Sequence, residues 1–324
     1  MGREEKMVDF KKIRTFSVKN RKNLVTYDNL KEPGIYIPKM WEDPDFDKLI
    51  DNIISARAKN RPVILSMGAH VVKNGLSKYL IKLVEEGFIT HIAGNGAASI
   101  HDFELALIGG TSEDVPTAIE DGSFGMWEET GRMMNEALSQ GAAKGLGYGE
   151  SLYEYVKQNS DKFPYKDICV FYSAQKAGIP VTYHVAIGTD IIHQHPIVNF
   201  ADIGKTTGED FKKYCDSISE LNEGVFLNFG SAVIGPEVFL KALSISRNLG
   251  YDTYKITTAN FDLINLGDYR RKTGYEDPNY YYRPGKNIVN RPVSMGGTGW
   301  HFCVDHNISI PKMYQELINR KNKR

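Results

Sequence analysis

The sequence predicts an α/β protein with a Rossmann-like parallel sheet and helices on both of its faces. From residue 46 onward, short apolar runs alternate with segments in which apolar residues recur at helical spacing. Four of the apolar runs end in turns of small or polar residues, as strands that lead into helices often do. Strands that alternate with helices indicate a parallel sheet with right-handed crossovers.

The individual elements follow from these patterns in chain order. The expected strands are residues 63–67, 89–93, 179–185, 224–229 and 254–258. The expected helices are residues 46–54, 76–86, 99–108, 126–140, 152–158, 211–221, 236–247 and 310–319. Residues 1–45 are expected to form a basic N-terminal arm and lead-in, either solvated or in contact with another subunit, and residues 46–324 to form a single domain.

Charge and cysteine content argue against several classes of function. The sequence holds 40 basic and 40 acidic side chains, so no net field favours nucleic acid or an anionic membrane. No run approaches the roughly 20 apolar residues that span a bilayer. The three cysteines show no metal-ligand spacing, and no secretory leader is recognisable. We therefore expect a cytoplasmic protein with a small-molecule or protein substrate.

The turns after the predicted strands carry the main functional signal. They are Gly68-Ala69, Gly94-Asn95-Gly96-Ala97, Gly188-Thr189-Asp190 and Gly230-Ser231-Ala232. Small residues let a ligand approach the backbone, and ligands of open α/β sheets bind beyond the carboxyl ends of the strands. The turns therefore predict a dinucleotide site, although tight turns also use glycine for structure alone. No complete Gly-x-Gly-x-x-Gly stands among them.

Asp190 and a group of histidines are the first candidates for chemistry. Asp190 could accept a hydrogen bond from a ribose hydroxyl or a substrate ammonium, or it could cap the following segment. His184, His193 and His195 are the densest histidine group in the chain. A metal site is one hypothesis, but no third ligand has a recognisable spacing. Polar contacts in a site or core are the preferred interpretation, and no metal ligand is assigned.

The segment Tyr280-Tyr281-Tyr282-Arg283-Pro284-Gly285-Lys286 combines aromatic rings with cations. Such neighbours could lower the pKa of Lys286 toward the range in which a neutral amine forms imines. The alternative is a solvated surface lysine. The sequence contains no Gly-x-Ser-x-Gly elbow, Walker loop, His-Glu-x-x-His or Cys-x-x-Cys motif, so several other chemistries lose support.

Taken in order, these motifs resemble the deoxyhypusine synthase family over residues 60 to 318. The family's binding loops are similar to Ala69-His70, Asn95-Gly96-Ala97-Ala98, His101-Asp102, Gly188-Thr189-Asp190 and Gly230-Ser231-Ala232-Val233-Ile234. The best matches are Thr257-Thr258-Ala259-Asn260-Phe261-Asp262 and the pair Asp305 and Pro311. Pro236 and Glu237 stand where the family has histidines, and only Gly285-Lys286 remains of its Trp-Gly-Lys motif.

The resemblance implies a homotetramer that binds NAD, oxidises spermidine and passes an aminobutyl group through a lysine imine to a protein lysine. The implied cofactor-binding residues are Gly68, Ala69, His70, Asn95, Gly96, Ala97, Asp190, Gly230, Ser231, Thr258, Ala259 and Asp305.

We predict an NAD-dependent aminoalkyl transferase acting on spermidine or a similar polyamine. In this prediction Asp190 and Glu237 steer the ammonium, and Lys286 forms the imine. His101, His184 or His193 carries protons near neutral pH. Two other hypotheses stay open: metal-assisted hydrolysis of an amide or amidine by Asp190 with the three clustered histidines, and a non-catalytic nucleotide-binding subunit.

Overall fold

The fold is built on six parallel strands, as a computed structural model that describes residues 8–270 and 274–323 shows. Across the sheet they run β5 (Val181–His184), β3 (His91–Asn95), β2 (Val63–Met67), β6 (Val225–Phe229), β7 (Thr257–Asp262) and β8 (Thr298–Cys303). All neighbouring pairs are parallel, so every strand ends at the same edge of the sheet. The α/β class with a Rossmann-like parallel sheet is confirmed.

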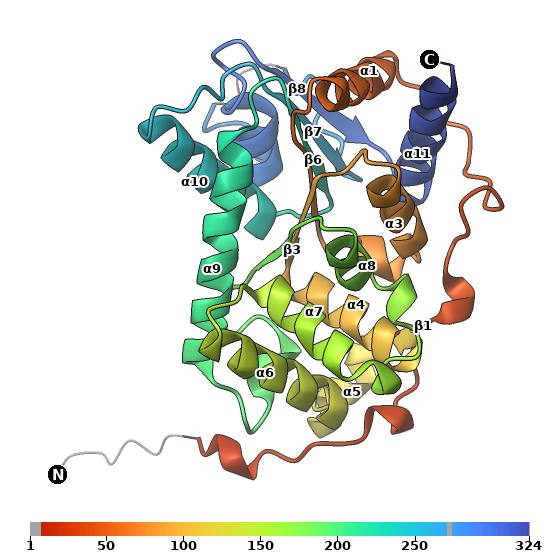
Figure 1. Ribbon diagram of the computed structural model, residues 1–324, viewed down its shortest axis with the longest axis vertical. Coiled ribbons are helices and arrows are strands. Elements are labelled where there is room, and N and C mark those ends of the chain that lie inside the picture. The colour runs from red at the N-terminus through yellow and green to blue at the C-terminus, as the bar shows by residue number, and fades with distance from the viewer. Residues whose placement is uncertain (1–7, 271–273, 324) are drawn as a thin grey trace.

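Helices cover both faces of this sheet (Figure 1). One layer contains α1 (Pro44–Ala58), α3 (Ser77–Glu85), α8 (Val170–Lys176) and α11 (His306–Asn322), and the other contains α9 (Phe200–Ser219) and α10 (Ile234–Asn248). The buried apolar residues form two clusters, and successive side chains of a strand point to opposite faces of the sheet. Leu65 and Leu227 therefore belong to one cluster, whereas Ile64 and Phe226 belong to the other. Because both faces are covered, β2 and β6 are apolar runs rather than alternating ones.

The remaining elements lie mostly beyond the carboxyl ends of the strands. The helices there are α2 (His70–Lys73), α4 (Gly96–Ile108), α5 (Val115–Asp121), α6 (Glu128–Ala143) and α7 (Tyr148–Gln158). Short helical turns are η1 (Phe10–Lys12), η2 (Val18–Asn20), η3 (Tyr27–Asn29), η4 (Ser160–Lys162), η5 (Lys166–Ile168), η6 (Ile191–Gln194), η7 (Pro278–Tyr281) and the π-helical η8 (Gly285–Asn290). None of the helices in the described ranges combines the length and apolar character needed to cross a bilayer.

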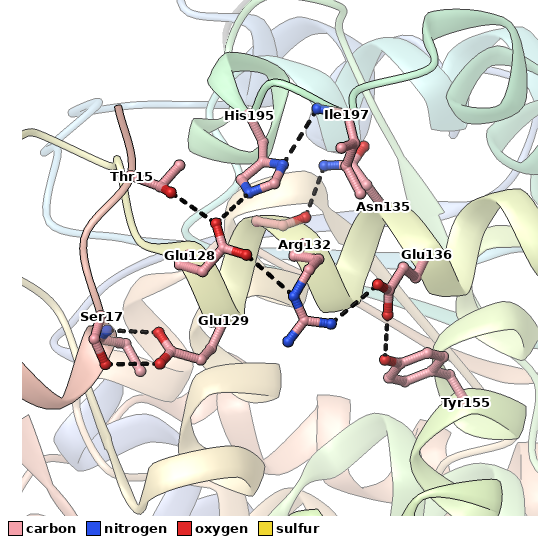
Figure 2. Close-up of polar contacts among 12 residues, drawn as sticks. Thr15, Ser17, Glu128, Glu129, Arg132, Asn135, Glu136, Tyr155, His195 and Ile197 are labelled. Carbon is pink, nitrogen blue, oxygen red and sulfur yellow. Dashed lines mark hydrogen bonds and ion pairs between the residues drawn. The ribbon is translucent and has the colours of Figure 1, made fainter. Parts of the chain in front are cut away.

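The N-terminal arm is packed against the domain. Its strand β1 (Val25–Thr26) pairs antiparallel with β4 (Gly110–Thr111). Thr15 donates a hydrogen bond to Glu128, and Ser17 donates one to Glu129, so the start of α6 holds the arm (Figure 2). Arg21 is buried. The expectation of a solvated arm therefore does not hold at these residues.

Among the elements that differ from the sequence-based prediction are β7, β8 and α9. The strand β7 ends at Asp262 rather than at residue 258. The apolar pattern stops too early because Asn260 is polar, although it is buried and bonded to Asn228 and His301. The edge strand β8 was not predicted, since Thr298–Cys303 contains Gly299 and His301 among few apolar residues. Helix α9 begins at Phe200, earlier than residue 211, with Asn199 as its N-cap.

Candidate functional site

The strand order reverses between β2 and β6. The chain passes from β2 to β3 and β5 on one side, then returns to β6, β7 and β8 on the other. In open α/β sheets, ligands bind in the crevice at this reversal, beyond the carboxyl ends of the strands. The predicted turns at Gly68, Gly96, Gly188 and Gly230 all lie along this edge.

Two glycines bring the backbone close together at the reversal. A Cβ atom on Gly68 would lie 2.7 Å from the Gly230 carbonyl oxygen. Gly230 has φ +68°, and a Cβ atom there would lie 2.6 Å from His306 Nε2. Both positions therefore need glycine for close approach, and Gly230 also needs it for its left-handed conformation.

A cavity of about 320 Å³ opens beside this contact. His70, Gly230, Asp262, Asp305 and His306 are among its lining residues. Burial lowers the pKa of His306, and the buried Nδ1 atom of this side chain has no hydrogen-bond partner among the described residues. The cavity thus offers two carboxylates, which accept hydrogen bonds from Tyr282, Leu263 and Asn307 and keep further acceptor sites for hydroxyls. We name it the crevice cavity.

Other residues expected to bind the cofactor point elsewhere. Thr258 and Ala259 lie inside β7 and are buried, and the Thr258 hydroxyl donates to the Ile288 carbonyl. The Ser231 hydroxyl accepts a hydrogen bond from the Gly235 amide. Asn95 caps α4 by accepting a bond from the Ala98 amide. Their side chains are therefore occupied by structural contacts in this state of the chain.

A second cavity, of about 290 Å³, lies at the ends of β3 and β5. Its floor is one stripe of α4, formed by Ala97, Ile100, His101 and Glu104, which recur at helical spacing. The short helix α2 borders both cavities, because His70 at its start lines the crevice cavity and Lys73 at its end lines this one. We name it the α4 cavity.

Glu104 anchors a buried polar chain at one end of the α4 cavity. Arg21 donates to both of its carboxylate oxygens, each at 2.8 Å. Thr111 and Thr130 donate to the same carboxylate at 2.5 Å and 2.9 Å. A buried ion pair is tolerated when its remaining hydrogen-bonding capacity is satisfied, and this arrangement meets that condition.

The chain fixes the tautomer of His101. The Thr111 hydroxyl donates its hydrogen bond to Glu104, so toward His101 Nδ1, which lies 2.7 Å away, it can only accept. His101 therefore carries its proton on Nδ1, and Nε2 keeps a lone pair with no partner among the described residues. Burial lowers the pKa of His101 to about 4, which keeps the imidazole neutral near pH 7. His101 is thus a neutral, oriented proton acceptor on the cavity floor.

Asp190 lines the opposite end of the same cavity. A Cβ atom on Gly96 would lie 2.0 Å from Asp190 Oδ2, so the carboxylate packs directly against the first turn of α4. Burial raises the pKa of Asp190 to about 6. His193 lies behind it, with Nε2 at 4.0 Å from Oδ2, and both atoms are buried without a hydrogen-bond partner among the described residues.

The backbone fixes His193 in this position. The amides of Gly188 and Asp190 both donate to His193 Nδ1 at 3.1 Å, so the ring proton is on Nε2. Burial lowers the pKa of His193. Farther along the same loop, His195 bonds Glu128 at 3.2 Å, and the Ile192 carbonyl accepts from Asn135. Helix α6 therefore holds both this loop and the N-terminal arm (Figure 2).

The three clustered histidines have separate partners. His184 contacts Thr182 and the Tyr214 ring, His193 accepts backbone amides, and His195 bonds Glu128. In the described part of the chain, no three histidine, cysteine or acidic side chains gather closely enough to hold a metal ion. The geometry therefore does not favour the hydrolase hypothesis.

Lys286 and Glu237 lie away from the α4 cavity. The Lys286 ammonium sits 4.1 Å from the centroid of the Tyr280 ring and lines a separate cavity of about 20 Å³. Glu237 is bound by Arg283, Lys241 and Asn287. The η8 turn that carries Lys286 packs on β7 and β8, and four strand spacings separate β7 from β5, about 19 Å. Within one protomer these residues do not meet Asp190.

Sequence reasoning named Ala97, His101, Thr189 and Asp190 of the α4 cavity but missed other lining residues. The missed residues are Arg21, Lys73, Glu104 and Glu113, together with Thr111, which bonds Glu104. His101 and Glu104 stand at i and i+3 on a helix, a spacing that places them on one face. That spacing was the available signal for this pair.

The structure is that of a Rossmann-like α/β protein with two cavities at the strand ends. No family model matches the chain, and no curated protein matches it. Among solved structures, the chain is similar to ArgZ, an arginine dihydrolase from the ornithine-ammonia cycle in cyanobacteria, with a TM-score of 0.51 and 14% identity. It covers 86% of this chain but 33% of ArgZ, so the chain spans about a third of that protein.

Two further structures are similar. A conserved LOR/SDH-like protein from Methanococcus maripaludis S2 matches with a TM-score of 0.50 and 13% identity, covering 90% of this chain and 74% of that one. A deoxyhypusine synthase-like protein from Entamoeba histolytica matches with a TM-score of 0.48 and 9% identity, covering 85% and 87%. At these identities the matches to ArgZ and to the Methanococcus maripaludis protein show a shared fold. Membership of the deoxyhypusine synthase family stays a prediction.

Proposed function

We propose that this chain is an NAD-dependent enzyme that oxidises a polyamine-like amine to an imine. The observation that carries the proposal is the presence of His101 and Asp190 in one cavity, at the ends of β3 and β5. A buried carboxylate suits binding of an ammonium, and a neutral base with a fixed lone pair suits removal of its proton before hydride leaves the carbon.

The crevice cavity fits a dinucleotide. Gly230 and Ala232 line this cavity, so a pyrophosphate could approach the backbone there without meeting a long side chain. Asp305 and Asp262 line the same cavity and can accept hydrogen bonds from ribose hydroxyls. NAD, when bound, supplies a hydride acceptor for the carbon that bears the nitrogen.

Residues of the α4 cavity then bind the amine and accept its proton. Asp190 binds the substrate ammonium by a charge-assisted hydrogen bond. His101 Nε2 accepts the ammonium proton, which leaves the nitrogen lone pair available as the carbon loses hydride. Thr111, Glu104 and Arg21 hold His101 in the tautomer that accepts at Nε2. Burial of Arg21, Glu104 and Thr111 shields the contacts among them from water, which strengthens these contacts.

Aminoalkyl transfer through Lys286 is the finer part of the proposal and rests on the sequence resemblance. Because Lys286 lies apart from Asp190 in one protomer, transfer would need a second subunit to bring the two together, as in the tetramer that the resemblance implies. Acceptance by a protein lysine belongs to the same prediction.

The direct test is formation of NADH on mixing the protein with NAD and a panel of amines, followed by borohydride and peptide mass spectrometry. We expect NADH with at least one amine. An adduct on Lys286 would support transfer, whereas NADH without any adduct would support oxidation alone. If no amine of the panel produced NADH, the proposed function would be refuted.

The pH profile of kcat/KM provides a second prediction. Ammonium binding needs ionised Asp190, whose pKa is raised by burial to about 6. His101, with a pKa lowered to about 4, is already neutral at that pH. The rate is therefore expected to rise with pH around an inflection near 6, and the Asp190→Asn variant is expected to lose this inflection along with most activity. An inflection that stays in this variant would assign it to another group.

Replacing Thr111 tests whether the hydrogen bonds among Thr111, Glu104 and Arg21 hold His101 in its tautomer. The Thr111→Val variant loses the acceptor of His101 Nδ1–H, and about one hydrogen bond of 1–2 kcal/mol corresponds to a fall in kcat of about tenfold. Thr111→Ser keeps the hydroxyl and should restore most of the rate. Steady-state kinetics of both variants, with thermal unfolding as a check of the fold, makes the comparison. An equal loss of rate in the serine and valine variants would argue against positioning of His101 by the Thr111 hydroxyl.

A further inference from the structure

The α4 cavity contains a cation with no counter-ion of its own. Lys73 lines the cavity at the end of α2 and has no ion-pair partner among the described residues. Arg21, the other cation of the wall, is neutralised by its two bonds to Glu104. Lys73 is therefore the free positive charge that a ligand in this cavity meets.

Two carboxylates lie at the two ends of the same cavity. Asp190 packs against Gly96 at the start of α4. Glu113 lies at the other end, where its carboxylate accepts a hydrogen bond from the Gly125 amide and feels the charges of Arg21 and Glu104. The stripe from Ala97 to Glu104 between these ends is about 10 Å long, at 1.5 Å per residue.

The walls between the carboxylates are largely apolar. Leu24, Ile100, Val115, Phe124 and Ile191 line the cavity there. Buried polar groups lose free energy when they stay unpaired, so a bound molecule should offer partners to both acids and to the lysine. A methylene chain with a cationic group at each end satisfies the acids and the apolar walls but leaves Lys73 facing like charge.

We propose that the α4 cavity binds a diamino carboxylic acid, with an ammonium at each acidic end and the carboxylate on Lys73. This inference rests on the proposed function and narrows its substrate class. The charges complement one another: Lys73, Asp190 and Glu113 each meet an opposite charge, while Arg21 and Glu104 satisfy each other. A four-carbon chain between the amines, with a hydrogen bond of about 2.8 Å at either end, reaches the length of the stripe.

The test compares ornithine with putrescine, which differ only by the carboxylate. Each is titrated calorimetrically into the full chain, with and without NAD. We expect ornithine to bind about 10- to 100-fold more tightly, since a charge-assisted hydrogen bond contributes that much. Lys73→Met should reduce this preference to near unity, and Lys73→Arg should preserve it. Lys82→Met is the matched control, because Lys82 is an exposed lysine paired with Glu85 outside the cavity.

Two outcomes would overturn the inference. One is putrescine binding as tightly as ornithine or more so. The other is Lys73→Met weakening both ligands equally, which would indicate a general effect on the cavity. The proposed function fails separately, since it requires NADH formation, whereas the calorimetric preference does not depend on hydride transfer. Oxidation of putrescine without a preference for ornithine would therefore refute only the inference.

Discussion

Replacing His101 by alanine is expected to lower kcat for NADH formation by roughly 10²- to 10⁴-fold, the contribution that a positioned general base makes. The reason is geometric. The Nδ1 proton of His101 is committed to Thr111, so the Nε2 lone pair is the part of the ring left to accept a proton in the α4 cavity. The measurement is steady-state absorbance of NADH with the amine that the wild-type chain oxidises best.

The His101→Gln variant serves as the matched control for packing. Glutamine is polar and similar in reach, but it cannot accept a proton near neutral pH. Both variants should therefore lose turnover while their thermal midpoints stay close to that of the wild type. If His101→Gln kept turnover within about threefold of wild type, proton transfer by His101 would have to be abandoned.

Replacing Arg21 by methionine is expected to lower the free energy of unfolding by about 3–5 kcal/mol, because it leaves a buried carboxylate without its counter-charge. The side chains of Arg21 and Glu104 are 3% and 1% exposed, and the pair joins the N-terminal arm to α4. Chemical denaturation of the purified variant gives the free energy. The loss should be partly recovered in a double variant that also carries Glu104→Gln, since the uncompensated charge is then removed.

Arg132 offers a matched comparison within the same region. It also bonds two glutamates, Glu128 and Glu136, but its side chain is 36% exposed. Arg132→Met is therefore expected to cost no more than about 1 kcal/mol. A similar loss in the Arg21 and Arg132 variants would show that burial of the first pair is not what stabilises the arm.

The sheet could be predicted from sequence where strands are buried on both faces. Val63–Met67 and Val225–Phe229 are fully buried and read as apolar runs, so the pattern alone identified them. The later strands could not be recognised in the same way. β7 contains the buried amide Asn260, and the edge strand β8 contains Thr298, Gly299 and His301, so neither presents a continuous apolar run.

The candidate site likewise contains residues that the sequence could predict and residues that it could not. Asp190 could be placed at a strand end because the Gly188-Thr189-Asp190 turn follows an apolar run. The partnership of Arg21 with Glu104 joins residues that are 83 positions apart, and no local periodicity reports such a contact. Arg21 also stands among many basic residues in the arm, so composition favoured a solvated segment. The three-dimensional path of the arm was needed to reveal it.

A crystal structure of the chain grown with NAD would test the central claim most directly. The account predicts the pyrophosphate against the backbone of Gly68 and Gly230, with ribose hydroxyls near Asp305 or Asp262. Density for NAD at another surface, or no bound NAD at saturating concentration while the crevice cavity is free of lattice contacts, would contradict it.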